Sequence, residues 1–145
     1  MFVKSLHALT SSRLAVVSRD ATVQEAAVSL SRPGVGLVAV CSGTGSLEGV
    51  LSKSDLIRHL CCPNAASAPA SALMSRSVVT CSPEEGVHDV WQSMTARGLQ
   101  NVPVVDDASR PVGMLDIRDA MKALFEEEAL QERMLFNYVT GVGYR

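Results

Sequence analysis

The apolar positions of the first sixty residues alternate between helical and strand-like spacing. Four of them share one face of a predicted helix: Val23, Ala26, Ala27 and Leu30. This i, i+3, i+4, i+7 spacing is that of an amphipathic helix, and Thr22 with Glu25 three residues later forms a capping-box pattern at its start. The next apolar run, Leu37–Val40, has no polar interruption, which is typical of a strand buried on both faces.

Two further strands and a second helix complete this unit. Leu14–Val17 is a short β-prone run. After a turn at Gly43–Gly45, Leu47–Leu51 is predicted to be a strand. Ser52 then begins a helix whose apolar residues are Leu56, Ile57 and Leu60. The predicted order is therefore strand, helix, strand, strand, helix.

The same pattern occurs a second time along the chain. Gly49–Asp55 is echoed by Gly113–Asp119, at an offset of 64 residues (119 − 55). The upstream apolar positions keep this offset: Val23 corresponds to Val87, Leu30 to Met94, Val38 to Val102 and Val40 to Val104. A fixed period indicates two copies of one supersecondary unit that bury their apolar faces together. A site built by one copy is therefore expected to have a counterpart in the other.

The second copy repeats the order of elements. Val78–Cys81 is predicted to be a strand. A helix follows, and its apolar face carries Val87, Val90, Trp91 and Met94. Gly98 ends this helix. Two strands, Val102–Val105 and Pro111–Leu115, come next, and the closing helix is expected over about Ile117–Phe136.

These patterns divide the chain into four parts. Residues 1–62 form the first repeat with its N-terminal segment, and residues 73–125 form the second repeat. Residues 63–72, rich in Ala, Ser and Pro, form the linker, with one helical turn expected before Met74. Residues 126–145 form a C-terminal helical extension and tail.

Composition and charge narrow the class of protein. With 47% hydrophobic residues, a chain of 145 residues can form one compact module with its own core. A net charge of −2 gives no general attraction to nucleic acid or to an anionic membrane. No apolar run approaches the roughly 20 residues that span a bilayer, and Met1–Leu9 is too short and mixed for a signal peptide. We therefore expect a cytoplasmic protein with neither nucleic acid nor a membrane as partner.

The residues that most often carry catalysis or bind metals form no recognisable motif. The four cysteines lack the spacing of a disulfide framework: Cys41, Cys61, Cys62 and Cys81. The three histidines do not combine with them into a zinc pattern: His7, His59 and His88. We expect buried, reduced thiols and no metal site. No nucleophile elbow, Walker sequence or pair of catalytic acids is present, so we expect no enzymatic activity.

The ordered elements and their motifs resemble a known family. Val102–Asp106 reads Val-Pro-Val-Val-Asp, two Gly-x-x-x-x-x-Asp segments lie 64 residues apart, and Leu73–Arg76 leads into Val78. This set is similar to tandem cystathionine β-synthase (CBS) domains and covers about residues 5–125. The resemblance implies an α/β (α+β) fold in which two pseudo-twofold-related β-α-β-β-α repeats form one CBS-pair module, often called a Bateman module. Its two sheets are expected to pack face to face.

The resemblance also implies two composite clefts for adenosine-containing ligands: AMP, ADP, ATP, S-adenosylmethionine or NAD(H). In each cleft, the Ser/Thr-x-x-Asp segment of one repeat faces the other repeat. Carried over to this sequence, cleft one consists of Val50, Ser52, Asp55, Met74, Arg76, Val79, Gln100 and Asn101. Cleft two consists of Thr10, Ala15, Val35, Gly36, Met114, Asp116 and Asp119.

The acidic segments have two interpretations. A carboxylate accepts two hydrogen bonds at once, so Asp55 or Asp119 suits the adjacent 2′- and 3′-hydroxyls of a ribose. Ser52 ends a strand and begins a helix, where its hydroxyl and the free backbone N–H groups can meet a phosphate. Ser-x-x-Asp and Asp-x-x-Asp are equally ordinary helix starts, with an N-cap and an acid in the first turn. Both interpretations remain open at this point.

The two clefts are not expected to be equal. The family commonly has Ser or Thr where Ser52 stands, and Asp116 departs from that pattern. A second carboxylate beside Asp119 would repel phosphate oxygens and favour a neutral or cationic group. Cleft two is therefore expected to take a nucleoside-like group or to stay empty, and Asp116 can equally serve only as an N-cap.

The sequence as a whole favours a regulatory protein. We expect it to bind AMP, ADP, ATP or NAD(H) as a regulatory ligand, with no cofactor required, and to relay that state to a regulated protein in signal transduction by population shift. The alternative is a ligand-free structural module for dimerisation or assembly. A nucleotide hydrolase is a third and weaker alternative, because no catalytic constellation is present.

The C-terminal segment carries more apolar residues than a free tail requires. They are Leu130, Met134, Leu135, Phe136, Tyr138, Val142 and Tyr144. Chain ends are usually polar and loose, and exposed apolar surface marks an interaction site. Two alternatives remain: a helix folded back on its own module, or a contact across a homodimer, which we expect.

Overall fold

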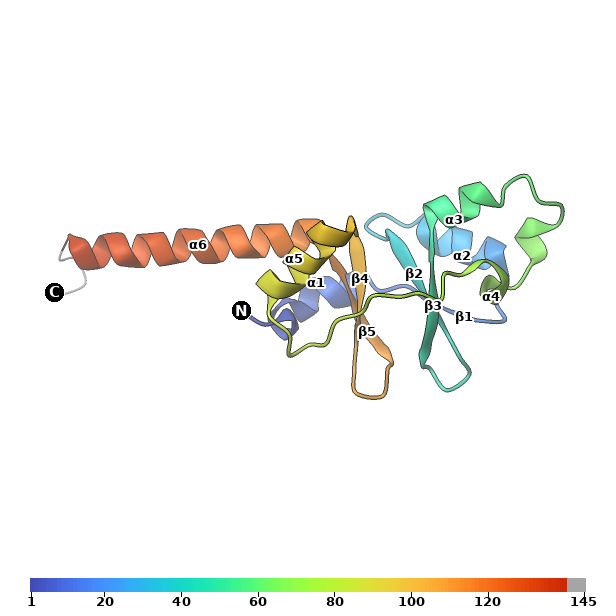
Figure 1. The fold of residues 1–145 in the computed structure, drawn as a ribbon, viewed down its shortest axis with the longest axis horizontal. Helices are drawn as coiled ribbons and strands as arrows, with labels where there is room; N and C mark the ends of the chain where they lie inside the picture. The colour runs from blue at the N-terminus through green and yellow to red at the C-terminus, as the bar shows by residue number, and fades with distance from the viewer. Residues whose placement is uncertain (141–145) are drawn as a thin grey trace.

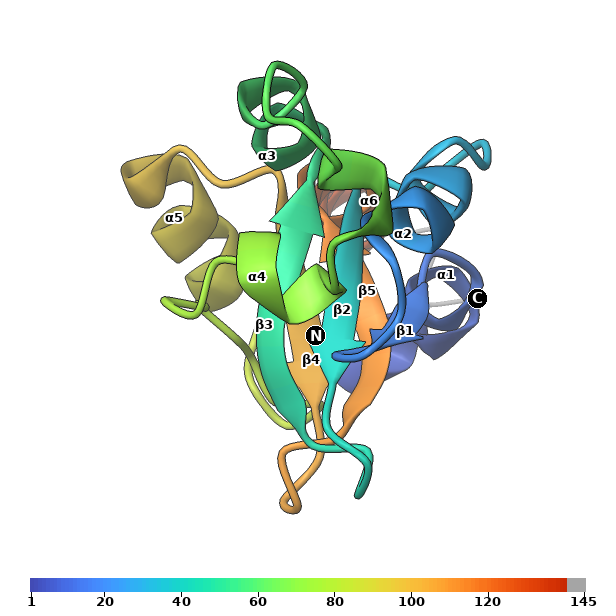
Figure 2. The same ribbon diagram turned by 90° about the vertical axis from the view of Figure 1, so that its right-hand side faces the viewer.

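The computed structural model describes residues 1–140 of the chain. Its strands are β1 (Val16–Ser18), β2 (Leu37–Cys41), β3 (Leu47–Ser52), β4 (Asn101–Val105) and β5 (Pro111–Asp116). Its helices are η1 (Val3–Leu6), α1 (His7–Ser12), α2 (Val23–Leu30), α3 (Lys53–Arg58), η2 (Ala65–Ser67), α4 (Ala70–Leu73), α5 (Val87–Arg97) and α6 (Ile117–Val139). Figures 1 and 2 show the β1-β2-β3 and β4-β5 sheets stacked face to face, with helices on the outer side of each. The predicted fold class is confirmed.

The first sheet has the predicted order of elements. β1 pairs with β2 in parallel, and β2 pairs with β3 antiparallel, with Val38 opposite Leu51. The predicted capping box of α2 is present, because the Thr22 hydroxyl accepts from the Glu25 backbone N–H and the Glu25 carboxylate accepts from that of Thr22. α3 is shorter than predicted: it ends at Arg58 and leaves Leu60 outside the helix and exposed.

The second sheet lacks one predicted strand. Val78–Cys81 forms no strand; only Cys81 pairs, in a single parallel bridge with Val104. In the first repeat, the Ala39 N–H donates to the Ala15 carbonyl and joins β1 to β2. The residue 64 positions after Ala39 is Pro103, which has no N–H to donate. The prediction was wrong because this proline removes the bond that would anchor the strand.

Each repeat is covered by a segment that comes from elsewhere in the sequence. Val3 and Leu6 of the N-terminal segment pack into the core of the second repeat, with α5, β4 and β5. Ala70, near the end of the linker, and Met74, just after it, pack into the core of the first repeat. The two repeats thus exchange their entry segments, which ties both halves into one module.

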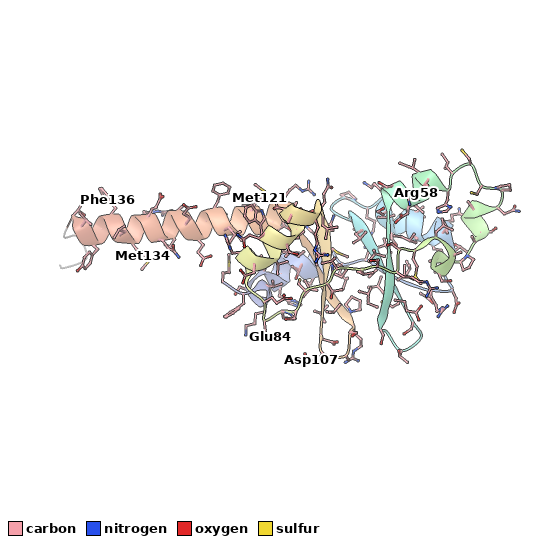
Figure 3. The ribbon with its side chains drawn as sticks, viewed as in Figure 1. Arg58, Glu84, Asp107, Met121, Met134 and Phe136 are labelled. Atoms are coloured by element: carbon pink, nitrogen blue, oxygen red, sulfur yellow. The ribbon has the colours of Figure 1, made fainter. Side chains whose placement is uncertain are left out.

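α6 extends far beyond the two sheets (Figures 1 and 3). Ala120 and Ala123 on its first turns are buried against the module. The large apolar side chains further along are exposed: Phe125, Leu130, Met134, Leu135, Phe136, Tyr138 and Val139. A helix folded back on its own module is therefore the wrong alternative over the described residues. Val142 and Tyr144 of the predicted apolar tail lie outside those residues.

No helix within residues 1–140 combines the length and the apolar character needed to cross a membrane.

Candidate functional site

The two repeats approach each other at a pair of equivalent glycines. A Cβ on Gly49 would lie 2.6 Å from the Met74 sulfur, and a Cβ on Gly113 would lie 2.6 Å from the Thr10 hydroxyl oxygen. Thr10 and Met74 are themselves 64 residues apart, so each covers the glycine of the opposite repeat. Only glycine leaves room for this approach. The structure therefore brings Thr10 and Met74 to the places that the pseudo-twofold relation requires.

The acidic segment of cleft one forms a complete capping box. Ser52 is the N-cap of α3, and its hydroxyl oxygen accepts from the Asp55 backbone N–H at 3.2 Å. Asp55 Oδ2 accepts from the Ser52 backbone N–H at 2.9 Å and from its hydroxyl at 3.0 Å. Asp55 Oδ1 accepts no hydrogen bond within residues 1–140; it has only Arg58 Nη1 at 3.5 Å, on a side chain that is 70% exposed. One carboxylate oxygen of Asp55 is thus left for a further donor.

The remaining residues of cleft one lie in different surroundings. Val50 is paired with Ser75 by two backbone hydrogen bonds of 3.0 and 2.9 Å. This bridge is antiparallel, so the chain after Ser75 runs along β3 away from Ser52, with Arg76 exposed and Val79 half-buried. Arg76 lines a separate hollow of about 210 Å³.

Gln100 and Asn101 lie beside the start of α6. The Gln100 carbonyl accepts from the Ile117 N–H at 2.9 Å, and a Cβ on Gly36 would lie 2.6 Å from the Asn101 amide nitrogen. Gly36, assigned to cleft two, therefore contacts Asn101, assigned to cleft one. The Asn101 amide oxygen is buried and has no hydrogen-bond partner among residues 1–140. Within residues 1–140, no hydrogen bond or ion pair joins the side chains of Ser52 and Asp55 to the second repeat.

Cleft two contains an arginine that the sequence did not single out. Arg13 donates to both carboxylate oxygens of Asp119: Nε to Oδ2 at 2.5 Å and Nη2 to Oδ1 at 3.1 Å. Its third nitrogen, Nη1, donates to the Gly34 carbonyl at 2.9 Å and lies 3.7 Å from Asp116 Oδ2. These hydrogen bonds to Asp119 raise the pKa of Arg13 above its usual value, against the opposing effect of burial.

Asp116 is a buried N-cap held by a neighbouring arginine. Its Oδ1 accepts from the Arg118 backbone N–H at 2.8 Å, and its two oxygens accept from Arg118 Nε and Nη2 at 3.0 and 2.9 Å. Burial alone would raise the pKa of Asp116, but the hydrogen bonds and charge of Arg118 and the charge of Arg13 outweigh it and lower this pKa. The expected repulsion between two acids is thus offset by two arginines.

The other residues assigned to cleft two belong to the interior. Ala15 and Val35 are buried in one core cluster of the first repeat. Met114 is fully buried opposite Pro103 in the β4–β5 register, and Val50 is buried opposite Ala39 in the β2–β3 register. Because alternate strand residues point to opposite faces, Met114 and Val50 lie on the faces away from the helical cores, between the sheets.

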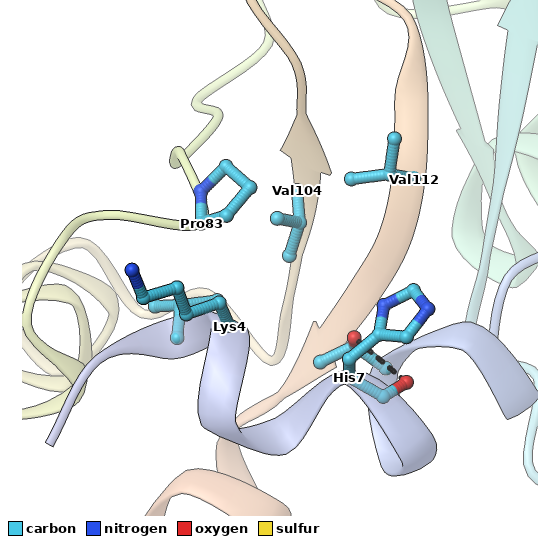
Figure 4. Close-up of a pocket in the computed structure, with 7 residues that line it drawn as sticks. Lys4, His7, Pro83, Val104 and Val112 are labelled. Carbon is cyan, nitrogen blue, oxygen red and sulfur yellow. Dashed lines mark hydrogen bonds between the residues drawn. The ribbon is translucent and has the colours of Figure 1, made fainter.

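One pocket lies beside cleft two rather than in it. It has a volume of about 440 Å³ and is lined by Val3, Lys4, His7, Thr10, Pro83, Val104 and Val112 (Figure 4). Thr10 is its only residue from the predicted clefts. Asp116 and Asp119 are not among its lining residues, so the volume and the acidic chemistry do not coincide.

Two of the predicted buried thiols are exposed. Cys61 and Cys62 lie on the surface after α3, whereas Cys41 and Cys81 are buried. Burial, with the nearby Glu85, raises the pKa of the Cys81 thiol to about 12. The expectation of four buried thiols was wrong because α3 ends before this pair and leaves it in a surface segment. All four thiols are free, and no cluster of three or more metal-ligating side chains occurs within residues 1–140.

Comparison with protein families decides what this arrangement is. The model of the CBS domain matches the chain twice, over residues 3–61 and 70–126. The chain belongs to the CBS-domain family. Two such matches in tandem make it a CBS pair.

Curated relatives and solved structures agree with this assignment. Arabinose 5-phosphate isomerase GutQ of Escherichia coli (strain K12) is 31% identical over 107 residues, which are 74% of this chain and 33% of that protein. The chain thus spans about a third of the length of this relative. The CBS pair of protein MJ0100, solved with 5′-methylthioadenosine and S-adenosyl-L-methionine, is 25% identical with a TM-score of 0.72, over 88% of this chain and 98% of that one.

A second similar structure is the cytosolic domain of the Mg²⁺ channel MgtE in complex with ATP. It is 26% identical with a TM-score of 0.65, over 77% of this CBS pair and 45% of that chain. Two proteins that share this fold were therefore solved with adenosine-containing ligands.

Proposed function

We propose that this CBS pair is a regulatory module that binds one adenosine-containing ligand in cleft one. The observation that carries the proposal is Oδ1 of Asp55, which accepts no hydrogen bond within residues 1–140 and has only the exposed Arg58 as an ion-pair partner, on a carboxylate whose other oxygen is held by Ser52. A fixed, half-occupied carboxylate is a suitable acceptor for a ribose hydroxyl. The complexes of the MJ0100 CBS pair and of the MgtE cytosolic domain support an adenosine-containing ligand.

The ligand class is AMP, ADP, ATP or NAD(H). Such a ligand would act by population shift, because it can change the geometry of the module only through its different affinity for two states. The exchange of entry segments between the repeats supports this mechanism, since Met74 and Val50 lie where one repeat meets the other. The regulated protein would then read the geometry of the module.

A thermal-shift and calorimetric screen tests the proposal. AMP, ADP, ATP and NADH are each titrated against the full chain, with adenine and inorganic phosphate as controls. A ligand that binds only the folded state adds about 2.7 kcal/mol to the free energy of unfolding at a hundredfold excess over its Kd. An unchanged melting temperature with all four ligands at millimolar concentration contradicts the proposal.

The alternative function is a ligand-free assembly module. Its supporting observation is that the hydrogen bonds of Ser52 and Asp55 already form a complete N-cap, which needs no ligand. We propose a homodimer under either function, with the far half of α6 in the contact. The exposed apolar residues of α6 between Leu130 and Val139 support it, because such surface marks an interaction site.

Removal of the distal part of α6 tests the homodimer. A stop after Glu128 should raise the dimer dissociation constant more than about tenfold, which corresponds to about 1.4 kcal/mol. Leu135→Glu should act in the same direction without shortening the helix, and Gln131→Glu serves as its polar control. Sedimentation velocity at several concentrations measures the constant. A monomeric full chain, or equal dimerisation after truncation, overturns this part of the proposal.

A further inference from the structure

We propose that Arg13 closes cleft two from within and excludes a nucleoside from it. The inference rests on the proposed function in so far as it treats the two clefts as sites for the same ligand class. It assigns Arg13 as the residue that limits the module to one ligand per chain.

The guanidinium of Arg13 occupies both carboxylate oxygens of Asp119. Asp119 therefore has no counterpart of Oδ1 of Asp55, which accepts no hydrogen bond within residues 1–140. Both carboxylate oxygens of Asp119 accept from Arg13, in a two-pronged arrangement. Such forked, charge-assisted pairs are stronger and more specific in geometry than neutral hydrogen bonds. The pair is also shielded: the side chains of Arg13 and Asp119 are 21% and 12% exposed. A ribose that needs the same carboxylate has to displace this arginine.

A nucleoside is a poor substitute for the arginine. Ribose hydroxyls donate hydrogen bonds but carry no charge. Their binding would leave the shielded Asp119 without the positive charge of Arg13, whereas Asp116 would keep Arg118. Burial of an uncompensated carboxylate is costly, so the exchange is unfavourable unless Arg13 finds another anion.

The same arginine also joins the two repeats. It follows α1 in the first repeat, donates to the Gly34 carbonyl of that repeat and holds Asp119 on α6 of the second. Cleft one has no equivalent, because the residue 64 positions after Arg13 is Ser77, whose short side chain carries no charge. Arg13 is thus a charged residue of cleft two that cleft one lacks at the corresponding position.

Calorimetry with AMP as the probe tests the inference. The wild-type chain should bind one AMP, and Arg13→Ser, which introduces the residue type of the corresponding position 77, should bind two. Arg13→Ser combined with Asp119→Ala should return to one. Arg110→Ser is the matched control, since Arg110 pairs with Asp106 in the β4–β5 turn outside both clefts. If the serine variant does not fold, Arg13→Gln takes its place, with the same expected gain.

The outcomes separate this inference from the proposed function. A wild type that already binds two AMP, or an Arg13→Ser variant that gains no site, overturns the closure of cleft two. If the wild type binds one AMP and loses it in Asp55→Ala while Arg13→Ser gains none, the proposed function stands and the inference fails. If the wild type binds none and Arg13→Ser binds one, the inference stands and the proposed role of cleft one fails.

Discussion

Cleft one and cleft two begin with the same element, a strand that ends in an N-cap residue followed three positions later by an aspartate. In cleft one, Asp55 turns back to its own N-cap and completes a local capping box. In cleft two, the N-cap residue Asp116 accepts a hydrogen bond from the Arg118 backbone N–H, and Asp119 accepts from Arg13 of the other repeat. Asp55 thus caps its own helix, whereas Asp119 forms an ion pair that joins the two repeats.

This difference shows how a duplicated framework acquires unequal sites. The glycine contacts made by Thr10 and Met74 are related by the offset of 64 residues, although Thr10 lies in helix α1 and Met74 is extended after α4. The inequality lies in side chains, Arg13 against Ser77 and Asp116 against Ser52, and also in the backbone, because Val50 pairs with Ser75 in cleft one. An arginine of the chain itself can occupy the carboxylate that would otherwise accept from a ligand. The carboxylate is then no longer available to the ligand.

The largest expected effect compares the two aspartates by ligand binding. Asp55→Ala should weaken AMP binding by about 1.5–3 kcal/mol, the range for hydrogen bonds to a charged group, which is roughly a ten- to hundredfold loss of affinity. Asp119→Ala should change the affinity of cleft one by less than about twofold, as expected for a separate site. Calorimetry on the folded variants measures both. Equal losses, or a larger loss at Asp119, would reverse the ranking of the clefts.

The next effect tests whether the shared framework is symmetric. A Cβ on Gly49 would also meet the Ser75 carbonyl oxygen at 2.8 Å, and a Cβ on Gly113 would meet the Thr10 Cβ at 2.8 Å. Gly49→Ala and Gly113→Ala should therefore each lower the free energy of unfolding by about 1–3 kcal/mol, the usual cost of overpacking. Urea denaturation measures this, with Gly43→Ala as the control because no atom lies within 4 Å of its Cβ. A loss of stability in one glycine variant and not in the other would contradict the prediction that the two contacts are equivalent.

The smallest effect concerns the charge of Asp116, which Ser52 lacks. Asp116→Asn keeps an N-cap but removes the attraction to Arg118 and Arg13, and should cost about 1 kcal/mol or less near neutral pH. The pKa of Asp116 is lowered in the folded protein. Its contribution is therefore present above the unfolded pKa of about 3.9 and is lost as the pH falls through the folded value. Unfolding curves from about pH 7 down to about pH 3 should show the difference from wild type begin to shrink below the unfolded pKa; a difference that stays constant would contradict this assignment.

Much of the fold could be predicted from local sequence. The capping box of Thr22 and Glu25, the apolar run of β2 and the end of α5 at Gly98 are all present where the pattern placed them. These features are readable because backbone hydrogen bonding and apolar periodicity act over a few residues. The absence of a strand at Val78–Cys81 also has a cause in the sequence, Pro103. That proline acts on a segment more than twenty residues away, through the pairing of two strands, so local patterns do not show its effect.

The candidate site was predicted less completely. Ser52 and Asp55 are brought together, as are Thr10 and Met74 with their glycines. Ala15 and Val35 are core residues, and Arg76 lies along β3 in the direction away from Ser52. A resemblance to a family predicts which positions line a cleft. Whether their side chains come together depends on the local path of the backbone.

The sequence by itself determined the duplication, the order of the elements and the two acidic helix starts, because a repeat of 64 residues and the spacing of apolar positions are properties of the chain alone. Only the tertiary structure decided that both oxygens of Asp119 accept hydrogen bonds from Arg13, while Oδ1 of Asp55 has only an ion pair with Arg58. Arg13 and Asp119 are 106 positions apart, and nothing local relates them. They meet because the entry segments exchange between the repeats, which places the end of α1 against the start of α6. A pairing of this kind depends on packing between distant segments, so it is absent from any short-range pattern.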